Sequence, residues 1–123
     1  MERGAVRVAG FGFRNGAGVE SLRAALAGAK VDALATAADK AAFPALRELA
    51  AALGVEIIPV PMEELTWVET LTQSARALAR YGTGSLAEAA ALCAAGPGAR
   101  LVGARGASPD RMAMVAIAER SGA

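Results

Sequence analysis

Short apolar runs recur along the chain and are separated by segments in which apolar residues have helical spacing. Runs rich in Val, Ile and Leu that are bounded by Gly, Pro or polar residues are typical of buried β-strands. The pattern predicts strands at Ala5–Ala9, Val31–Thr36, Val55–Val60, Leu101–Gly103 and Met112–Ala118. The first strand is expected to end at Gly10, in a glycine-rich turn that continues to Gly18.

The segments between these runs have the periodicity of helices. They predict helices at Val19–Ala27, Pro44–Leu53, Gln73–Arg80 and Leu86–Ala95, with a short helical turn at Met62–Trp67. Leu22 and Leu26 fall on one face of the first helix. Pro44 suits the first turn of the second helix and Gly54 is a stop signal just after it.

The alternation of strands and helices predicts the fold class. It favours an α/β fold, a three-layer α/β/α sandwich with a mixed, largely parallel sheet of about five strands. The last two predicted strands lie too close in sequence for a parallel crossover, so they are expected to form an antiparallel hairpin or to be neighbours in a mixed sheet. The chain shows no linker and no repeat, so residues 1–123 are expected to form a single domain.

Composition excludes several classes of protein. With 54% hydrophobic residues and a mean hydropathy of +0.37, the chain is expected to fold. A net charge of +1 and an aromatic content of 4% argue against binding of nucleic acid. No run approaches the roughly 18 apolar residues of a membrane span. The first residues lack the apolar core of a secretory signal, so a cytoplasmic location is expected.

The scarcity of cysteine and histidine limits the available chemistry. The sequence has one Cys and no His, which excludes a Ser-His-Asp triad, a Cys-His dyad and a His-based zinc site. Neither a metal nor a bound cofactor is expected. Cys93 lies in an Ala-rich helical segment and is interpreted as a buried small apolar residue. Any catalysis would use carboxylates, Lys, Arg, hydroxyls or backbone amides.

The segment Gly82-Thr83-Gly84-Ser85 is a glycine loop that precedes a predicted helix. Ser85 can cap this helix, and Glu88 three residues later completes a capping box. Gly82 and Gly84 allow the backbone to approach a ligand closely. The helix N-terminus would then attract a carboxylate or phosphate. The alternative is a well-capped helix with no ligand, and the residues themselves leave both open.

A second glycine-rich segment, Gly10 to Gly16, follows the first predicted strand. Three residues separate Gly12 from Gly16, so the spacing does not match a Rossmann fingerprint, and the Gly-Lys-Ser/Thr end of a phosphate-binding loop is missing. Arg14 is suited to bidentate pairing with a carboxylate. It can equally be a solvated surface residue.

A third polar segment follows the second predicted strand. Thr36 can donate a hydrogen bond, Lys40 supplies a positive charge, and Asp39 can cap the next helix. Because strand ends and helix starts can meet at one edge of an α/β sheet, the three segments are expected to converge. Together they would suit a ligand with several carboxylates.

These motifs resemble the cobalamin-biosynthesis family that comprises CobE and the C-terminal domain of CbiG. The resemblance extends from about Val6 to Ala118. The family's G-T-G-S-[VL]-A-E-A-A-A-L block is matched in full by Gly82 to Leu92, and its closing strand by Val115–Ala118. Arg14 and the glycines around it match the family's first loop.

The chain departs from the family pattern at several positions. Phe13 stands in place of the usual Cys of the first loop, and Asn15 in place of a second basic residue. Ala38 stands where an Asp is usual, although Thr36 and Lys40 match. The family's T-P-S segment is matched by Thr72-Gln73-Ser74 without the Pro, which makes Ser74 a further candidate ligand-binding residue.

The resemblance implies a role in making the corrin ring of vitamin B12. CbiG-like proteins carry an additional N-terminal region and are linked to opening a ring-A lactone, so this chain is more similar to a stand-alone CobE that binds or carries a corrinoid intermediate. One alternative is a hydrolase of the cobalt-precorrin-5A type, with Asp39 or Glu88 as the base. The other is a non-catalytic subunit that docks on another cobalamin-pathway enzyme. Formation of a homodimer stays open.

Overall fold

The computed structural model describes residues 6–65, 86–102 and 106–121 of the chain. Its strands are β1 (Val6–Phe13), β2 (Ala33–Ala37), β3 (Glu56–Val60), β4 (Arg100–Leu101), β5 (Gly106–Ala107) and β6 (Ala113–Arg120). Its helices are α1 (Val19–Leu26), α2 (Pro44–Leu53), α3 (Met62–Leu65) and α5 (Leu86–Ala95), with the 3-10 turn η1 (Ala38–Lys40) after β2. Strands and helices alternate as predicted.

The strands form one mixed sheet in the order β3-β2-β1-β6-β4, and β5 also pairs with β6. The pairs β1–β2 and β2–β3 are parallel, whereas β6 is antiparallel to β1, β4 and β5. Because β4 and β5 both oppose β6, they run in the same direction as β1. Among the described strands only β6 is reversed, which confirms the mixed, largely parallel sheet.

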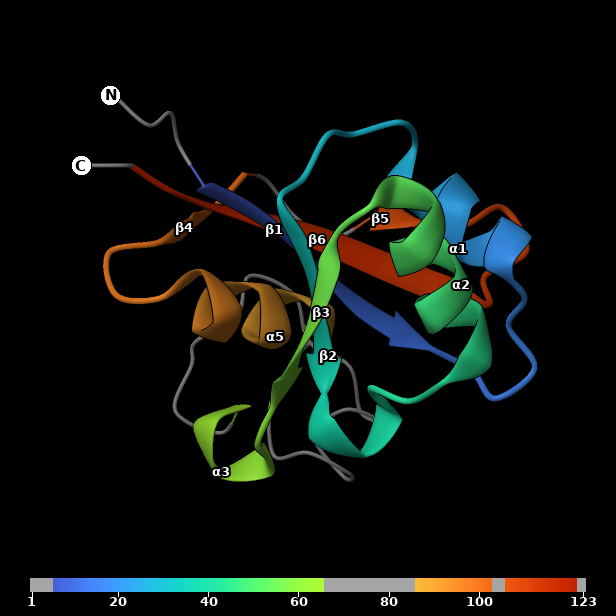
Figure 1. Cartoon of the computed structure of the whole chain (residues 1–123), viewed down its shortest axis with the longest axis horizontal. Helices are drawn as coiled ribbons and strands as arrows, with labels where there is room; N and C mark the ends of the chain where they lie inside the picture. Colours follow the sequence, from blue (N-terminus) through green and yellow to red (C-terminus); the bar gives the residue numbers. More distant parts are fainter. Residues whose placement is uncertain (1–5, 66–85, 103–105, 122–123) are drawn as a thin grey trace.

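Helices cover both faces of this sheet, as Figure 1 shows. α1 and α2 pack on one face, around a core that includes Phe11, Leu22, Leu34, Leu46 and Leu49. α5 packs on the other face, against small side chains such as Ala33, Ala35 and Ala118. Alternate residues of β1 and β2 face the two cores, as the period of a strand requires. The predicted three-layer α/β/α fold is confirmed.

The expected end of the first strand is wrong. β1 continues past Gly10 to Phe13, and the loop begins only at Arg14. Gly10 lies under α5, where an added Cβ would be 2.1 Å from the carbonyl oxygen of Ala87. This glycine therefore allows close packing of the helix on the strand and does not form a turn.

The C-terminal strands form the antiparallel arrangement that the short spacing predicts. Leu101 pairs with Ala118, and Gly106 pairs with Val115. β5 was not predicted, because two residues of Gly and Ala carry no strand signal.

Two predicted helical elements are not fully covered by the described residues. The helix expected at residues 73–80 and the end of the helical turn at Trp67 lie outside the described residues. Among the residues that are described, no helix has the length and apolar character needed to cross a membrane.

Candidate functional site

The carboxyl ends of β1 and β2 form one edge of the sheet. The two strands are parallel neighbours, with Gly10 opposite Ala35, so their following segments emerge side by side. β1 leads into a loop that begins at Arg14, and β2 leads into η1. Two of the three polar segments predicted from the sequence therefore meet at this edge, which is where open α/β sheets bind ligands.

Lys40 joins the two segments. Its Nζ donates a hydrogen bond to the carbonyl oxygen of Phe13 at 3.0 Å and another to Asn15 Oδ1 at 3.4 Å. The same Nζ lies 5.0 Å from the centre of the Phe13 ring, within the range of a cation–π interaction. The Lys40 ammonium group is therefore fixed against the end of β1.

An aromatic pair lies beside this lysine. The rings of Phe13 and Phe43 are 4.5 Å apart between centroids and tilted by 32°. Both side chains are partly buried and pack against the core under α1 and α2. The Phe13 ring therefore contacts both the Phe43 ring and the Lys40 ammonium group.

Arg14 is held by its backbone while its side chain is exposed. Its N–H donates to the carbonyl oxygen of Met112 at 2.9 Å, and its own carbonyl accepts from the N–H of Ala17 at 3.0 Å. Within the described residues, no hydrogen bond or ion pair engages its guanidinium group. The charged end of Arg14 is therefore open to solvent at the edge that holds Lys40.

Thr36 does not reach this surface. Its side chain is fully buried in β2, and its hydroxyl donates to the carbonyl oxygen of Phe11 at 2.8 Å. The hydroxyl proton is therefore donated to β1 inside the sheet. The geometry gives Thr36 a role in joining β2 to β1 and not in touching a ligand.

The N-terminus of α5 lies at the same edge, next to Gly12. An added Cβ on Gly12 would lie 3.7 Å from Leu86 Cβ and 3.9 Å from the backbone nitrogen of Ala87. The strand therefore passes close to the first amides of the helix, which carry partial positive charge. Glu88 in the first turn of α5 is fully buried.

The remaining candidates are divided between the edge and undescribed segments. Asp39 is exposed in η1, next to Lys40. Gly16 is exposed in the loop after β1, where an added Cβ would lie 3.3 Å from Met112 Cε. The other candidates, Ser74 and the segment Gly82-Thr83-Gly84-Ser85, lie outside the described residues.

Cys93 differs in part from the expectation of full burial. Its side chain is half-buried in α5, and its thiol donates to the carbonyl oxygen of Glu64 at 3.4 Å. Burial, and to a smaller extent the nearby Glu64 carboxylate, raise the pKa of this thiol. A raised pKa lowers the fraction of the reactive thiolate, which does not favour Cys93 as a nucleophile.

Comparison with known proteins identifies the family. The sequence pattern described as "Cobalamin synthesis G C-terminus" matches residues 7–118 of the 123-residue chain. The chain belongs to this cobalamin-biosynthesis family. No curated relative matches it.

Two solved structures of cobalamin-biosynthesis proteins are similar to this chain over all or nearly all of its length. One is CobE, described as a protein from the cobalamin (vitamin B12) biosynthetic pathway, with a TM-score of 0.84 and 36% identity over 100% of this chain and 96% of CobE. The other is the cobalamin biosynthesis protein chiG from Agrobacterium tumefaciens str. C58, with a TM-score of 0.73 and 37% identity over 94% of this chain and 99% of chiG. The protein is therefore a cobalamin-biosynthesis protein of the CobE and CbiG C-terminal family.

The family member described here has site features that the sequence did not reveal. Phe43 and Asn15 both contribute to the position of Lys40. The turn at Ser108 and Asp110 supports the loop after β1 through Met112. The Ser-Pro-Asp spacing of this turn is a signal for a side chain that bonds its own backbone, and it could have been recognised.

Proposed function

We propose that this family member binds a corrinoid intermediate at the edge formed by the ends of β1 and β2, as a stand-alone binding or carrier protein. The observation that carries the proposal is the exposed guanidinium group of Arg14, which has no partner among the described residues. Arg14 directly follows Phe13, whose carbonyl oxygen accepts a hydrogen bond from the Lys40 ammonium group. Two cations on adjacent strand ends would bind two carboxylates of one ligand.

The chemistry of corrin precursors fits this arrangement. Their rings carry acetate and propionate side chains, so a single molecule presents several carboxylates. Arginine pairs with a carboxylate through two parallel hydrogen bonds, and lysine adds a point charge. The amides at the start of α5 would favour a further carboxylate near Gly12. The rings of Phe13 and Phe43 supply apolar surface for the ring methyl groups.

Hydrolysis of a ring lactone is the second candidate function. It needs a base that can reach a water molecule beside the substrate. Glu88 is fully buried, whereas Asp39 is exposed in η1 next to Lys40. Asp39 is therefore the candidate base at this edge, and a release of two-carbon aldehyde from lactone substrate would require it. The third candidate, a subunit that docks on another pathway enzyme, would need no ligand.

An absorbance titration with hydrogenobyrinic acid tests the binding proposal. Arg14→Ala is expected to weaken binding by about tenfold to a hundredfold, since hydrogen bonds to charged groups contribute roughly 1.5–3 kcal/mol. Lys40→Met is expected to weaken it in the same direction. Ser85→Ala tests the glycine-rich segment that precedes α5 in the sequence.

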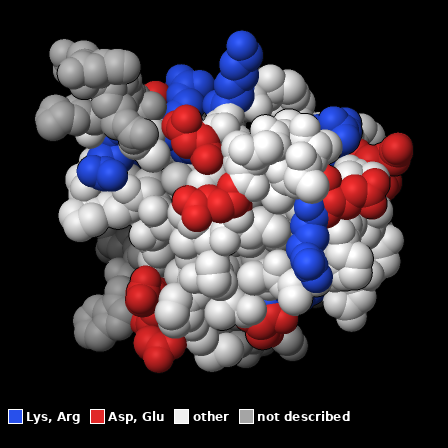
Figure 2. Space-filling view, viewed as in Figure 1, with Lys and Arg blue, Asp and Glu red and all other residues white. Residues whose placement is uncertain are grey.

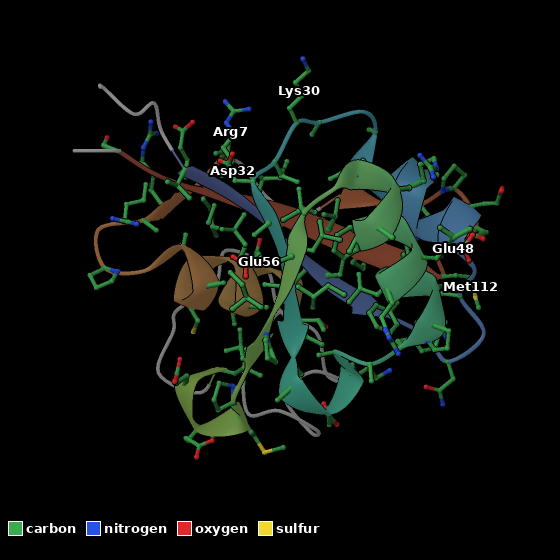
Figure 3. All side chains as sticks on the ribbon, viewed as in Figure 1. Arg7, Lys30, Asp32, Glu48, Glu56 and Met112 are labelled. Atoms are coloured by element: carbon green, nitrogen blue, oxygen red, sulfur yellow. The ribbon has the colours of Figure 1, made fainter. Side chains whose placement is uncertain are left out.

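Lys30→Met is the matched control for the lysine variant. Lys30 lies before β2, at the opposite end of that strand from Lys40, and Figure 3 shows it near Arg7 and Asp32. Its removal is expected to leave the affinity unchanged. A corrinoid whose side chains are amidated controls for the charge of the ligand. Absence of wild-type binding to hydrogenobyrinic acid and to earlier ring intermediates would overturn the carrier function in favour of docking, and turnover of lactone substrate would favour the hydrolase.

A further inference from the structure

A hydrogen-bonded cluster lies on the turn between β5 and β6, next to the loop that begins at Arg14. Asp110 accepts hydrogen bonds from three groups: Ser108 Oγ at 2.6 Å, the backbone N–H of Met112 at 3.0 Å, and Ser21 Oγ on the first turn of α1. Ser108 is 2% exposed and also accepts from the N–H of Ala113 at 3.1 Å. The carboxylate thus ties the turn to α1.

The charge of Asp110 suits its position. The N-cap of α1 is Gly18, which has no side chain to cap the helix. Because Ser21 lies in the first turn, the bond from Ser21 Oγ brings the Asp110 carboxylate to the positive end of the helix dipole. The hydrogen bonds from Ser108, Ser21 and Met112 hold the pKa of Asp110 below its ordinary value. The carboxylate is ionised at neutral pH.

Met112 links this cluster to the candidate site. Its N–H donates to Asp110, and its carbonyl oxygen accepts from the N–H of Arg14 at 2.9 Å. Its side chain also lies against Gly16, where an added Cβ would be 3.3 Å from Met112 Cε. Figure 3 shows Met112 at the same side of the molecule as the end of β1. Met112 therefore makes one backbone hydrogen bond to the cluster and one to the loop.

We propose that Asp110 is a positioning residue for the corrinoid site: it fixes Met112, and through Met112 it fixes the backbone of Arg14. The inference rests on the proposed function. The loop is held on its other side by Lys40, which bonds Phe13 and Asn15. With both sides fixed, Arg14 gives up only side-chain freedom when a carboxylate binds, so the affinity is higher than that of a mobile loop.

A double-mutant cycle tests this coupling. Hydrogenobyrinic acid is titrated into the wild type, Asp110→Ala, Arg14→Ala and the double variant. If Asp110 acts through Arg14, Asp110→Ala weakens binding by about tenfold in the wild type and by less than about twofold once Arg14 is absent. Equal effects in both backgrounds would show a general structural role and overturn the proposal.

Two further variants separate positioning from loss of stability. Asp110→Asn keeps an oxygen that can accept from Met112 and Ser108, so it is expected to recover most of the affinity. Glu119→Ala removes a carboxylate from the other end of β6, where it pairs with Arg7 at 2.9 Å and with Arg100 at 3.4 Å. Glu119→Ala also removes polar contacts of a carboxylate, but it is expected to leave the affinity for hydrogenobyrinic acid unchanged.

Amide hydrogen exchange gives a readout that needs no ligand. Asp110→Ala is expected to speed exchange of the Arg14 N–H well beyond that of amides in the middle of β1, because the Arg14 N–H loses its fixed acceptor on Met112. Unchanged protection of Arg14 would refute the positioning role. If the wild type fails to bind while the Arg14 amide responds as expected, the proposed function fails and the Asp110–Arg14 coupling stands.

Discussion

Gly10 and Gly12 lie on the same face of β1, yet the structure gives them different roles. At Gly10 an added Cβ would be 2.1 Å from the carbonyl oxygen of Ala87 and 2.6 Å from the nitrogen of Ala91. Both are backbone atoms of α5, which cannot turn away as a side chain can. At Gly12 the nearest atom is Leu86 Cβ at 3.7 Å, an ordinary contact.

Gly10→Ala is therefore expected to destabilise the protein strongly. The methyl group would push α5 off the sheet, and overpacking typically costs about 1–3 kcal/mol, with backbone clashes such as this one at the upper end. Gly12→Ala is the matched control and is expected to cost less than about 1 kcal/mol, because a β-strand accepts Ala without strain. Urea denaturation of both variants measures the difference, and equal free energies of unfolding would contradict the packing role of Gly10.

Acid is expected to remove the stabilising contribution of Asp110. Its pKa in the folded protein is lowered below the unfolded value of about 3.9, mainly by the hydrogen bond from Ser108. The contribution is then fully present above the unfolded pKa and is lost as the pH falls through the folded pKa. Denaturant melts of the wild type and Asp110→Asn at pH 7 and at low pH measure this. The wild-type advantage should shrink on acidification, and an advantage independent of pH would contradict it.

Single residues also show what the sequence could not reveal. Arg14 and Lys40 were identified by residue type, and the structure brings them to one edge. Thr36 was identified in the same way, but its hydroxyl is used by Phe11 inside the sheet. Whether a polar side chain faces solvent or the neighbouring strand depends on register, and register comes from tertiary pairing.

At the scale of elements, helix α5 shows that the spacing of apolar residues can predict a helix without predicting which face of it packs on the sheet. Nearly all of its residues are apolar, and seven of its ten are buried. A helix that is apolar all round has no stripe to mark the face that packs on the sheet. The sequence therefore predicted the helix correctly but not its close contact with Gly10, and so it placed a turn where β1 continues.

α2 ends as the sequence predicted, and the contribution of its C-terminal glycine to stability can be tested by substitution. Gly54 has a φ of 71° and its N–H bonds the carbonyl oxygens of Ala50 and Ala51. Gly54→Ala is expected to cost about 1 kcal/mol, because a side chain disfavours this left-handed conformation. No neighbouring atom would meet the new methyl group, so the cost is one of backbone strain alone.

Gly18→Ala, at the start of α1, is the control for Gly54→Ala. Gly18 precedes α1 with a φ of −97°, and it too has open space around it. Its replacement is expected to leave the free energy of unfolding nearly unchanged. Thermal or denaturant melts of the two variants compare them directly, and a harmless Gly54→Ala would show that the cap adds no stability.

For the whole molecule, charge is nearly balanced, so the proposed binding would have to come from local groups. The net charge is +1, and Figure 2 shows acidic and basic side chains scattered among uncharged ones on the face viewed. Such a surface gives little long-range attraction to an anionic ligand. The proposed affinity therefore depends on the few cations at the ends of β1 and β2.

Ligand binding is expected to raise the thermal stability of the whole domain. A ligand that binds only the folded state stabilises it by about 2.7 kcal/mol at a concentration one hundred times Kd. The melting temperature should rise with the concentration of hydrogenobyrinic acid in the wild type and in Lys30→Met. Arg14→Ala should shift less at the same concentration. A shift of equal size in all three proteins would indicate binding away from the proposed edge.

The sequence predicted the molecule's layers, but the order of its strands came from the structure. β6, the last strand in the chain, lies between β1 and β4 and runs against both. The spacing of apolar residues and β-propensity predict that a segment forms a strand, but they do not predict which strand it pairs with. The pairing of the first strand with the last joins residues more than a hundred positions apart, such as Val6 and Arg120.

This pairing has a consequence for how the protein can be attached to something else. Val6 and Arg120 are partners across β1 and β6, so the start of β1 lies beside the end of β6, as Figure 1 shows. They lie at the start of β1, whereas Arg14 follows its far end. A tag, a surface anchor or a fused enzyme joined to either of these strand ends would therefore lie at the opposite end of β1 from the edge proposed to bind carboxylates.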